Sequence, residues 1–146
     1  MQKLRQAALL GALLGLAAGG GLAGAQEAVS VEDYEDAMQE LRYLVSDASI
    51  HLDASYWGDL GEDTDKMREQ FARVVSFWEA QGQAEAVELA GNAIEAARAI
   101  ARASGAQDPS AATAGLEDLR GACAACHEQF REETADGFRI KPSALQ

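Results

Sequence analysis

Two cysteines and a histidine within five residues carry the most distinctive chemistry of this chain. They form the pattern Cys-x-x-Cys-His at Cys123, Cys126 and His127. This pattern attaches a c-type haem, because each thiol adds across a vinyl group of the porphyrin and the histidine binds the iron as its proximal ligand. The chain has only two cysteines and two histidines, and the motif takes three of these four residues. The sequence therefore predicts one covalently bound haem c, with its iron.

Two other chemistries use a Cys-x-x-Cys pair. A redox dithiol usually opens a helix after a β-strand, and no strand pattern precedes Cys123. A structural zinc ion needs four ligands, and the second histidine, His51, is far away in sequence with no cysteine near it. Both alternatives are therefore less favoured than haem attachment.

The first 25 residues have the pattern of a cleaved secretory signal peptide. Lys3 and Arg5 precede an apolar run over residues 7–18, and the small residues Ala-Gly-Ala follow at 23–25. The run is too short and too glycine-rich for a membrane span, and no later segment is hydrophobic enough to cross a bilayer. Since bacteria attach haem c outside the cytoplasm, we expect the mature protein, residues 26–146, to be periplasmic.

The mature chain has the length of one small domain and is strongly acidic. Without Lys3 and Arg5 its formal charge is 10 - 24 = -14. This charge makes nucleic acid an unfavourable partner, and it favours periplasmic redox proteins with basic docking faces. A well-solvated helical surface accounts for the same acidic residues equally well.

Apolar periodicity predicts four helices. The first covers residues 30–52, with Ser30 as N-cap and Asp33 completing a variant of the capping box. A loop is expected at 53–63, because it contains Gly58 and Gly61. The other helices are expected at about 64–81, 83–103 and 109–135, the last capped by Asp108 before Pro109 and ended by Asp136-Gly137, with a tail at 138–146. Their expected apolar stripes are 31, 34, 38, 41, 45, 48 and 52; 67, 71, 74 and 78; 87, 90, 94, 97 and 101; and 112, 116, 119, 123, 126 and 130.

Four helices of similar length with short connections predict an all-α fold, an antiparallel up-down-up-down four-helix bundle with the haem near one end. The haem motif lies about 20 residues before the end of the chain. In ordinary small cytochromes c it lies near the N-terminus of the mature chain. The position of the motif therefore separates this chain from that class.

The segment from Cys123 to Arg131 resembles the C-terminal signature of class II c-type cytochromes, the group of cytochrome c prime and its low-spin relatives. That signature is Cys-x-x-Cys-His, two variable residues, an aromatic residue and an arginine, and it reads CAACHEQFR here. The same ending is similar to that of the soluble b-type four-helix cytochrome, which carries a methionine on its first helix. Residues 34–38, YEDAM, are similar to that methionine-bearing segment.

Three side chains compete for the sixth position on the iron: Met38, Met67 and His51. Met38 is about eight residues into the first helix and His127 about seven from the end of the fourth, which puts them about 12 and 10 Å from the same end of the bundle. His51 and Met67 belong to the opposite end. Met38 is the expected distal ligand, because it lies level with His127 and because the resemblance supports it. A methionine on such an apolar stripe also serves as core filler.

The same reasoning from bundle level gives the expected wall of the haem pocket: Leu41, Val74, Trp78, Val87, Ala90 and Phe130. Arg131 is expected to pair with a haem propionate or to shield the proximal face, and a solvated helix-end arginine is an equally weighted alternative.

Together these features favour a one-electron carrier, not an enzyme, since a peroxidase would want a distal acid-base residue. The rival is a five-coordinate, high-spin protein of the cytochrome c prime type, in which Met38 only lines the pocket and nitric oxide or carbon monoxide binds the iron. The sequence leaves open whether the bundle forms a homodimer through an exposed face of its first two helices.

Overall fold

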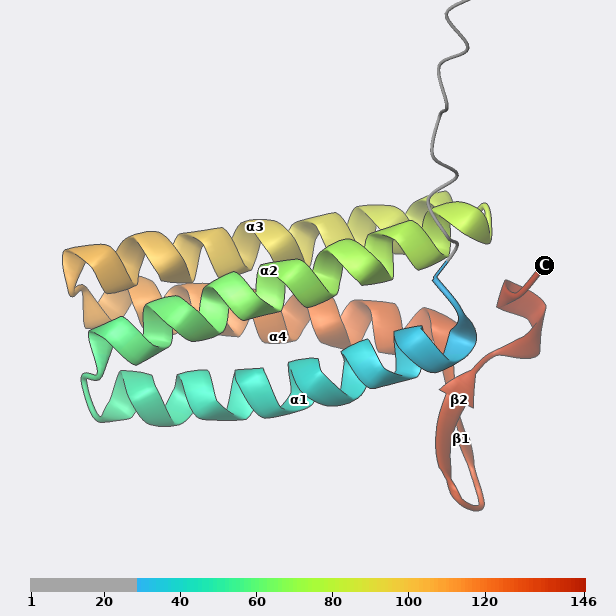
Figure 1. The fold of residues 1–146 in the computed structure, drawn as a ribbon, viewed down its shortest axis with the longest axis horizontal. Coiled ribbons are helices and arrows are strands. Elements are labelled where there is room, and N and C mark those ends of the chain that lie inside the picture. The colour runs from blue at the N-terminus through green and yellow to red at the C-terminus, as the bar shows by residue number, and fades with distance from the viewer. Residues whose placement is uncertain (1–28) are drawn as a thin grey trace, which may run out of the picture.

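A computed structural model describes residues 29–146, so the predicted signal peptide at 1–25 lies outside the described residues. Four long helices run up, down, up and down, side by side (Figure 1). A short antiparallel hairpin and one 3-10 turn follow them. The elements are α1 (Val31–Asp53), α2 (Trp57–Ala80), α3 (Ala84–Ala106), α4 (Pro109–Phe130), β1 (Arg131–Thr134), β2 (Gly137–Ile140) and η1 (Pro142–Ala144). The predicted four-helix bundle is confirmed.

Side-chain caps fix where two of the helices begin. Ser30 Oγ accepts a hydrogen bond from the backbone N–H of Asp33 at 3.0 Å, and Asp33 Oδ2 accepts one from the backbone N–H of Ser30 at 3.2 Å. Asp108 Oδ1 accepts from the backbone N–H of Ala111 at 3.0 Å, with Pro109 in the first turn. These bonds satisfy backbone donors that have no partner inside the helix. Both predicted N-caps are confirmed.

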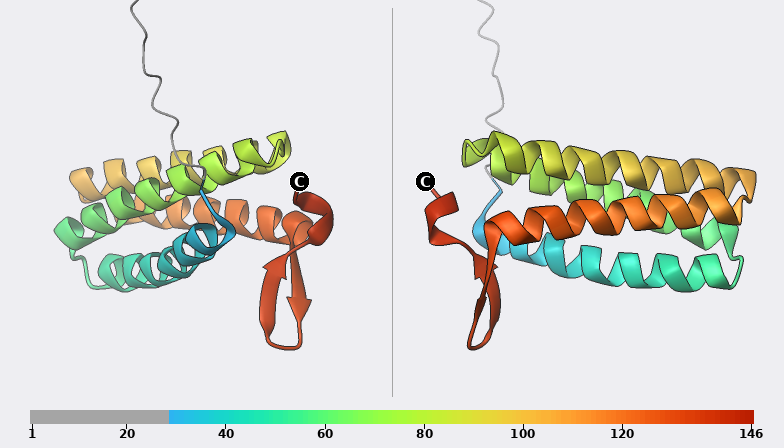
Figure 2. Two further views of the ribbon diagram at one scale, coloured as in Figure 1. Left: turned by 45° about the vertical axis from the view of Figure 1, so that its right-hand side comes forward. Right: turned by 180° about the vertical axis from the view of Figure 1, so that it is seen from behind.

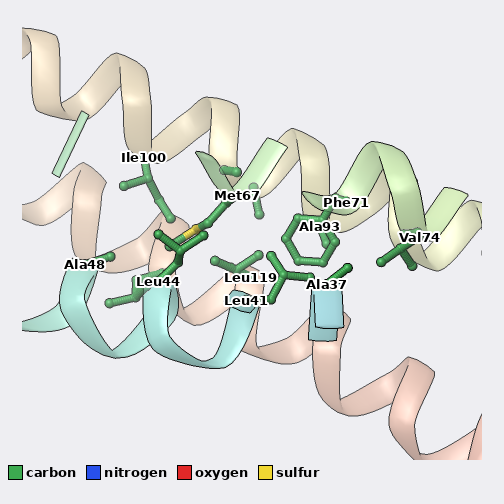
Figure 3. Packing of buried hydrophobic residues seen from close by; sticks show 14 of the residues in the cluster. Ala37, Leu41, Leu44, Ala48, Met67, Phe71, Val74, Ala93, Ile100 and Leu119 are labelled. Carbon is green, nitrogen blue, oxygen red and sulfur yellow. The ribbon is translucent and has the colours of Figure 1, made fainter. Parts of the chain in front are cut away.

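The core runs along the axis of the bundle and is built from one apolar stripe of each helix (Figure 3). In α1 the stripe is displaced from the predicted one: Ala37 and Leu44 are buried, whereas Met38 and Val45 are only half-buried and Val31 is exposed. Met38 and Val45 therefore lie beside the core, along the flank of α1, instead of within it.

The second helix begins at Trp57, seven residues earlier than predicted. Gly58 and Gly61 indicated a loop, but both are helical. A β-carbon at Gly61 would lie 3.4 Å from Ser104 Oγ, an ordinary van der Waals contact, so α2 faces α3 at this position. Leu60 continues the apolar stripe of α2 by another turn and is fully buried. Burial of this extra turn outweighs the weak helix propensity of the glycines.

The fourth helix ends at Phe130, not at Asp136-Gly137, and the residues after it form a hairpin that the sequence reasoning missed. β1 pairs with β2 from Arg131 opposite Ile140 to Thr134 opposite Gly137. Gly137 has φ of +137°, a conformation that favours glycine and permits the tight turn. The hairpin stands off the end of α4, and the chain then returns across the end of the bundle (Figure 2).

The four helix interfaces are unequal. Successive helices pack closely, but α1 and α4, which close the bundle, touch far less than the other neighbouring pairs. The bundle is thus partly open along one side. Within residues 29–146, no helix combines the length and the hydrophobicity that a membrane span requires.

Candidate functional site

The Cys-x-x-Cys-His motif lies in the last two turns of α4, at the end of the bundle where α1 begins. Residues three and four apart on a helix share one face, so Cys123 lies beside both Cys126 and His127. Leu119 and Leu116, one and two turns before Cys123, are buried and anchor this face of α4 against the core. The rigid helix therefore holds two thiols and one imidazole on one side.

This side of α4 faces a cavity of about 580 Å³ on the open side of the bundle. The volume is in the range of sites for small molecules and cofactors. Both cysteines and His127 line the cavity from α4, and Met38 lines it from α1. Most of its wall is apolar. The predicted wall residues that do line it are Leu41, Val74, Ala90 and Phe130.

Trp78 is not part of that wall, contrary to the prediction. It is fully buried behind the wall, where its ring lies 5.1 Å from that of Phe130 and 5.5 Å, edge to face, from that of Tyr34. Val87 is half-buried and does not line the cavity either. Trp78 lies on the same side of α2 as Val74, but the rings of Tyr34 and Phe130 lie between it and the cavity. It supports two wall residues instead of contacting the cavity.

Burial keeps the three motif side chains in neutral forms. It lowers the pKa of His127, and the positive charge of Arg131 lowers it further. Burial raises the pKa of Cys123, and it raises that of Cys126 to about 11, with a smaller contribution from Cys123. Neutral imidazole is the form that binds a metal. A redox dithiol needs an accessible thiolate of low pKa, so these raised values argue against that alternative.

These features fit a haem c. Two thiols and a neutral imidazole on one helical face are the donor set that attaches this group, and the apolar cavity beside them offers room for a flat hydrophobic cofactor. The wide spacing of α1 and α4 gives that room without disturbing the other interfaces. Among residues 29–146 no cluster of three or more His, Cys, Asp or Glu side chains could hold a metal ion by itself.

Tyr34 and Met38, four residues apart on α1, both line the cavity. Tyr34 is buried, and its ring packs 4.4 Å from that of Phe77. Burial raises the pKa of its phenol, so Tyr34 is neutral at physiological pH. Met38 is half-buried, which leaves its side chain free to reach into the cavity.

Arg131 is the first residue beyond α4 and lines the rim of the cavity. It is exposed, and its guanidinium lies 4.0 Å from the ring centre of Phe138 in the hairpin. At the rim, Arg131 could either pair with a haem propionate or shield the proximal face, the two roles toward a haem predicted from the sequence. The stacking on Phe138 is an additional contact that the sequence reasoning did not foresee.

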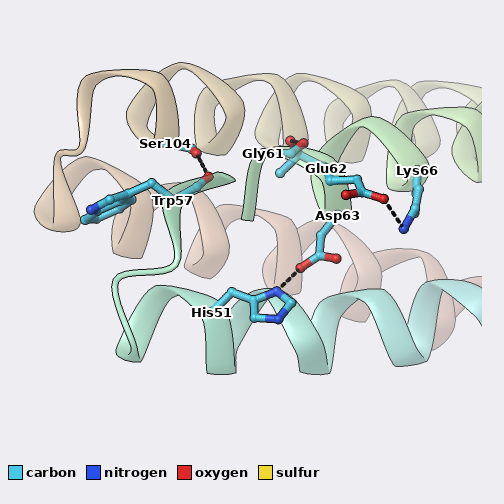
Figure 4. Close-up of polar contacts among 8 residues, drawn as sticks. His51, Trp57, Gly61, Glu62, Asp63, Lys66 and Ser104 are labelled. Carbon is cyan, nitrogen blue, oxygen red and sulfur yellow. Dashed lines mark hydrogen bonds and ion pairs between the residues drawn. The ribbon is translucent and has the colours of Figure 1, made fainter. Parts of the chain in front are cut away.

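The two competing ligands do not line the cavity. Met67 was expected at the opposite end of the bundle, but because α2 begins seven residues earlier, Met67 is fully buried in the middle of the core, near Leu44 (Figure 3). His51 lies at the far end of α1, where its Nδ1 is 2.7 Å from Asp63 Oδ2 of α2 (Figure 4). Neither residue lines the cavity.

Several wall residues were missed from the sequence. Arg42 lines the cavity from α1, although its guanidinium also lies 5.1 Å from the ring centre of Tyr43. Phe71 comes from the predicted apolar stripe of α2, one turn deeper in the bundle than the expected pocket, whereas Ala93 of α3 lies outside the predicted stripe of its helix. The hairpin adds Phe138, Arg139 and Ile140. The alternation of apolar residues at 138 and 140 was a detectable strand signal for this part of the wall.

Comparison with known proteins gives one match. The family model described as Cytochrome C' matches residues 45–131, more than half of the chain. The chain belongs to the cytochrome c′ family, as the resemblance of its C-terminal motif predicted. No curated protein and no solved structure gives a significant match. Proteins of this family carry haem c, are usually periplasmic, and transfer electrons or bind gases. The match includes the haem motif and excludes both Met38 and the hairpin beyond Arg131.

Proposed function

We propose that this protein is a periplasmic one-electron carrier whose haem c is attached at Cys123 and Cys126, with His127 and Met38 as axial ligands. One observation carries the proposal. Met38 of α1 and His127 of α4 line the same cavity, and these two helices make less contact with each other than the other neighbouring pairs do. When bound, the haem supplies an iron that takes up and gives back a single electron.

The residues of the chain have separate tasks in this proposal. Cys123 and Cys126 hold the cofactor as thioethers, and α4 fixes the orientation of His127. The apolar wall excludes water from the iron, which disfavours the extra charge of the oxidised state and raises the reduction potential. A methionine held by a rigid helix closes the coordination sphere, so little rearranges when the electron arrives. We assign no catalytic residue.

The rival function is gas binding at a five-coordinate iron, with Met38 only lining the distal side. Membership of a family that includes gas-binding proteins favours this candidate, and the family match does not extend to Met38. The two functions differ in spin state. Optical spectra of the purified protein in both oxidation states distinguish them: low-spin bands support the carrier, and high-spin bands support the gas binder.

A further inference from the structure

The residues after α4 close one side of the cavity. We call residues 131–146 the C-terminal strap. Its strand β2 contributes Phe138, Arg139 and Ile140 to the cavity wall, beside the motif residues of α4. Ile140 is buried at 8% exposure, so the hairpin is packed onto the bundle at this point. Apart from Arg131, the strap lies beyond the residues that match the family model.

Hydrogen bonds tie the strap to the bundle at both ends. Next to α4, the backbone N–H of Lys141 donates to Phe130 O at 2.8 Å, and Lys141 Nζ donates to Glu128 O at 2.9 Å. At the other end, Gln83 Nε2 donates to Ala144 O at 2.9 Å, and the backbone N–H of Gln146 donates to Gln81 Oε1 at 2.8 Å. The strap therefore spans from the end of α4 to the turn between α2 and α3 (Figure 2).

Phe138 is the unusual residue of the strap. It lines the cavity, yet its side chain is 61% exposed, the highest exposure among the large hydrophobic residues described. Arg131 stacks on its ring, and Arg139 is paired with Glu132 across the hairpin at 2.6 Å. The ring thus stacks on Arg131 at the rim of the cavity. Exposure of so much aromatic surface to water is unfavourable. A flat apolar group bound in the cavity beneath the ring would bury part of that surface.

We propose that Phe138 and Ile140 cover the edge of the haem and exclude water from it, so that the strap raises the reduction potential of this protein. The inference rests on the proposed haem attachment and concerns residues that no family match covers. Solvent exposure of a haem lowers its potential, because water stabilises the more highly charged oxidised iron. Loss of either side chain should therefore make the haem more exposed and harder to reduce.

The test compares Phe138→Ala and Ile140→Ala with the parent holoprotein and with Leu145→Ala. Leu145 is an apolar strap residue that does not line the cavity, so it controls for a general loosening of the strap. Phe138 is exposed, so its replacement leaves folding intact. The readouts are the reduction potential and the shift of the Soret band on addition of ethylene glycol, which reports how much of the porphyrin touches solvent.

We expect both wall variants to show a larger solvent-induced shift than the parent. Their equilibrium constant for reduction should fall at least about threefold, which is about 28 mV at 59 mV per tenfold for one electron. Leu145→Ala should match the parent in both readouts. Unchanged potential and shift in Phe138→Ala, with covalent haem present, would overturn the strap proposal and leave the proposed function standing. A parent protein without covalent haem would overturn both.

Discussion

Met38 on α1 and His127 on α4 line the same cavity from opposite sides of the loosest helix interface in the bundle. They lie far apart in sequence, and only the antiparallel return of the chain makes them neighbours. Helix rise and the antiparallel topology predicted that they would lie near the same end of the bundle, and both line the cavity there, although α4 ends five residues earlier than predicted. Because the structure leaves space between their two helices, a flat cofactor fits there without unpacking the core.

Removal of both thiols should abolish covalent haem attachment. In Cys123→Ala/Cys126→Ala no thioether can form, because the chain has no other cysteine. After denaturing electrophoresis, a haem stain should colour the parent band and leave the variant band unstained. Extraction of the haem from the parent protein by acid acetone would contradict thioether attachment.

Folding should depend on the cofactor. The cavity leaves α1 in poor contact with α4, so the apoprotein lacks packing that a haem would supply. A covalent ligand of the folded state stabilises that state and does not dissociate. The apoprotein should therefore melt well below the holoprotein in circular dichroism. Equal melting temperatures would show that the bundle core is sufficient without haem.

The closeness of α3 and α4 should make Gly115 intolerant of a side chain. A β-carbon at this position would lie 2.8 Å from Ile100 Cγ1 and 3.3 Å from the backbone nitrogen of Ile100. Gly115→Ala should lower the free energy of unfolding by about 1–3 kcal/mol through overpacking. Gly121→Ala is the matched control on the same helix, with nothing within 4 Å of its β-carbon, and should raise stability by up to about 1 kcal/mol. Urea unfolding of both variants measures the difference, and equal behaviour would refute the close approach.

The His51–Asp63 pair should stabilise the fold in a pH-dependent way. The hydrogen bond to Asp63 raises the pKa of His51 above its ordinary value of 6.5, with further help from the charges of Asp63, Asp59 and Asp47. A raised pKa in the folded state means that protonation favours folding. The contribution is complete below pH 6.5 and is lost as the pH rises through the raised pKa.

This contribution is isolated by comparing the parent with His51→Gln in urea unfolding from pH 5.5 to 9. The stability advantage of the parent should be largest at the acidic end and should shrink toward the alkaline end. An advantage that is constant with pH would mean that His51 contributes through packing and not through its charge.

The parts of the fold that follow from local rules could be predicted from the sequence. Ser30 and Asp108 predict where α1 and α4 begin, because their side chains cap the first turns. The buried stripe of α4 follows from its apolar periodicity. The haem motif could be predicted from the spacing of its two cysteines and its histidine alone. The prediction of Met38 as a ligand also required the helix rise and an assumed antiparallel topology.

The errors arose where one signal has two meanings. Gly58 and Gly61 marked a loop by composition, but burial of Leu60 between them keeps this segment helical. Asp136-Gly137 indicated a helix end, and it also suits a hairpin turn, which the alternation at Phe138 and Ile140 should have favoured. Trp78 lies on the predicted stripe of α2, but Tyr34 and Phe130 cover it, and the periodic pattern of one helix does not show which residues of other helices cover a side chain.

The central claim, ligation of the iron by Met38, is tested most directly by the spectrum of Met38→Leu. Leucine keeps the hydrophobic volume nearly constant, and such a swap usually costs less than about 1.5 kcal/mol. A large spectral change would therefore report lost ligation and not lost packing. Met67→Leu is the control, since Met67 is fully buried in the core and does not line the cavity. We predict that Met38→Leu becomes high-spin, loses the weak far-red band of methionine-ligated haem, binds carbon monoxide readily and has a lower reduction potential, whereas Met67→Leu keeps the parent spectrum. A Met38→Leu spectrum identical to that of the parent would contradict the assignment and favour gas binding.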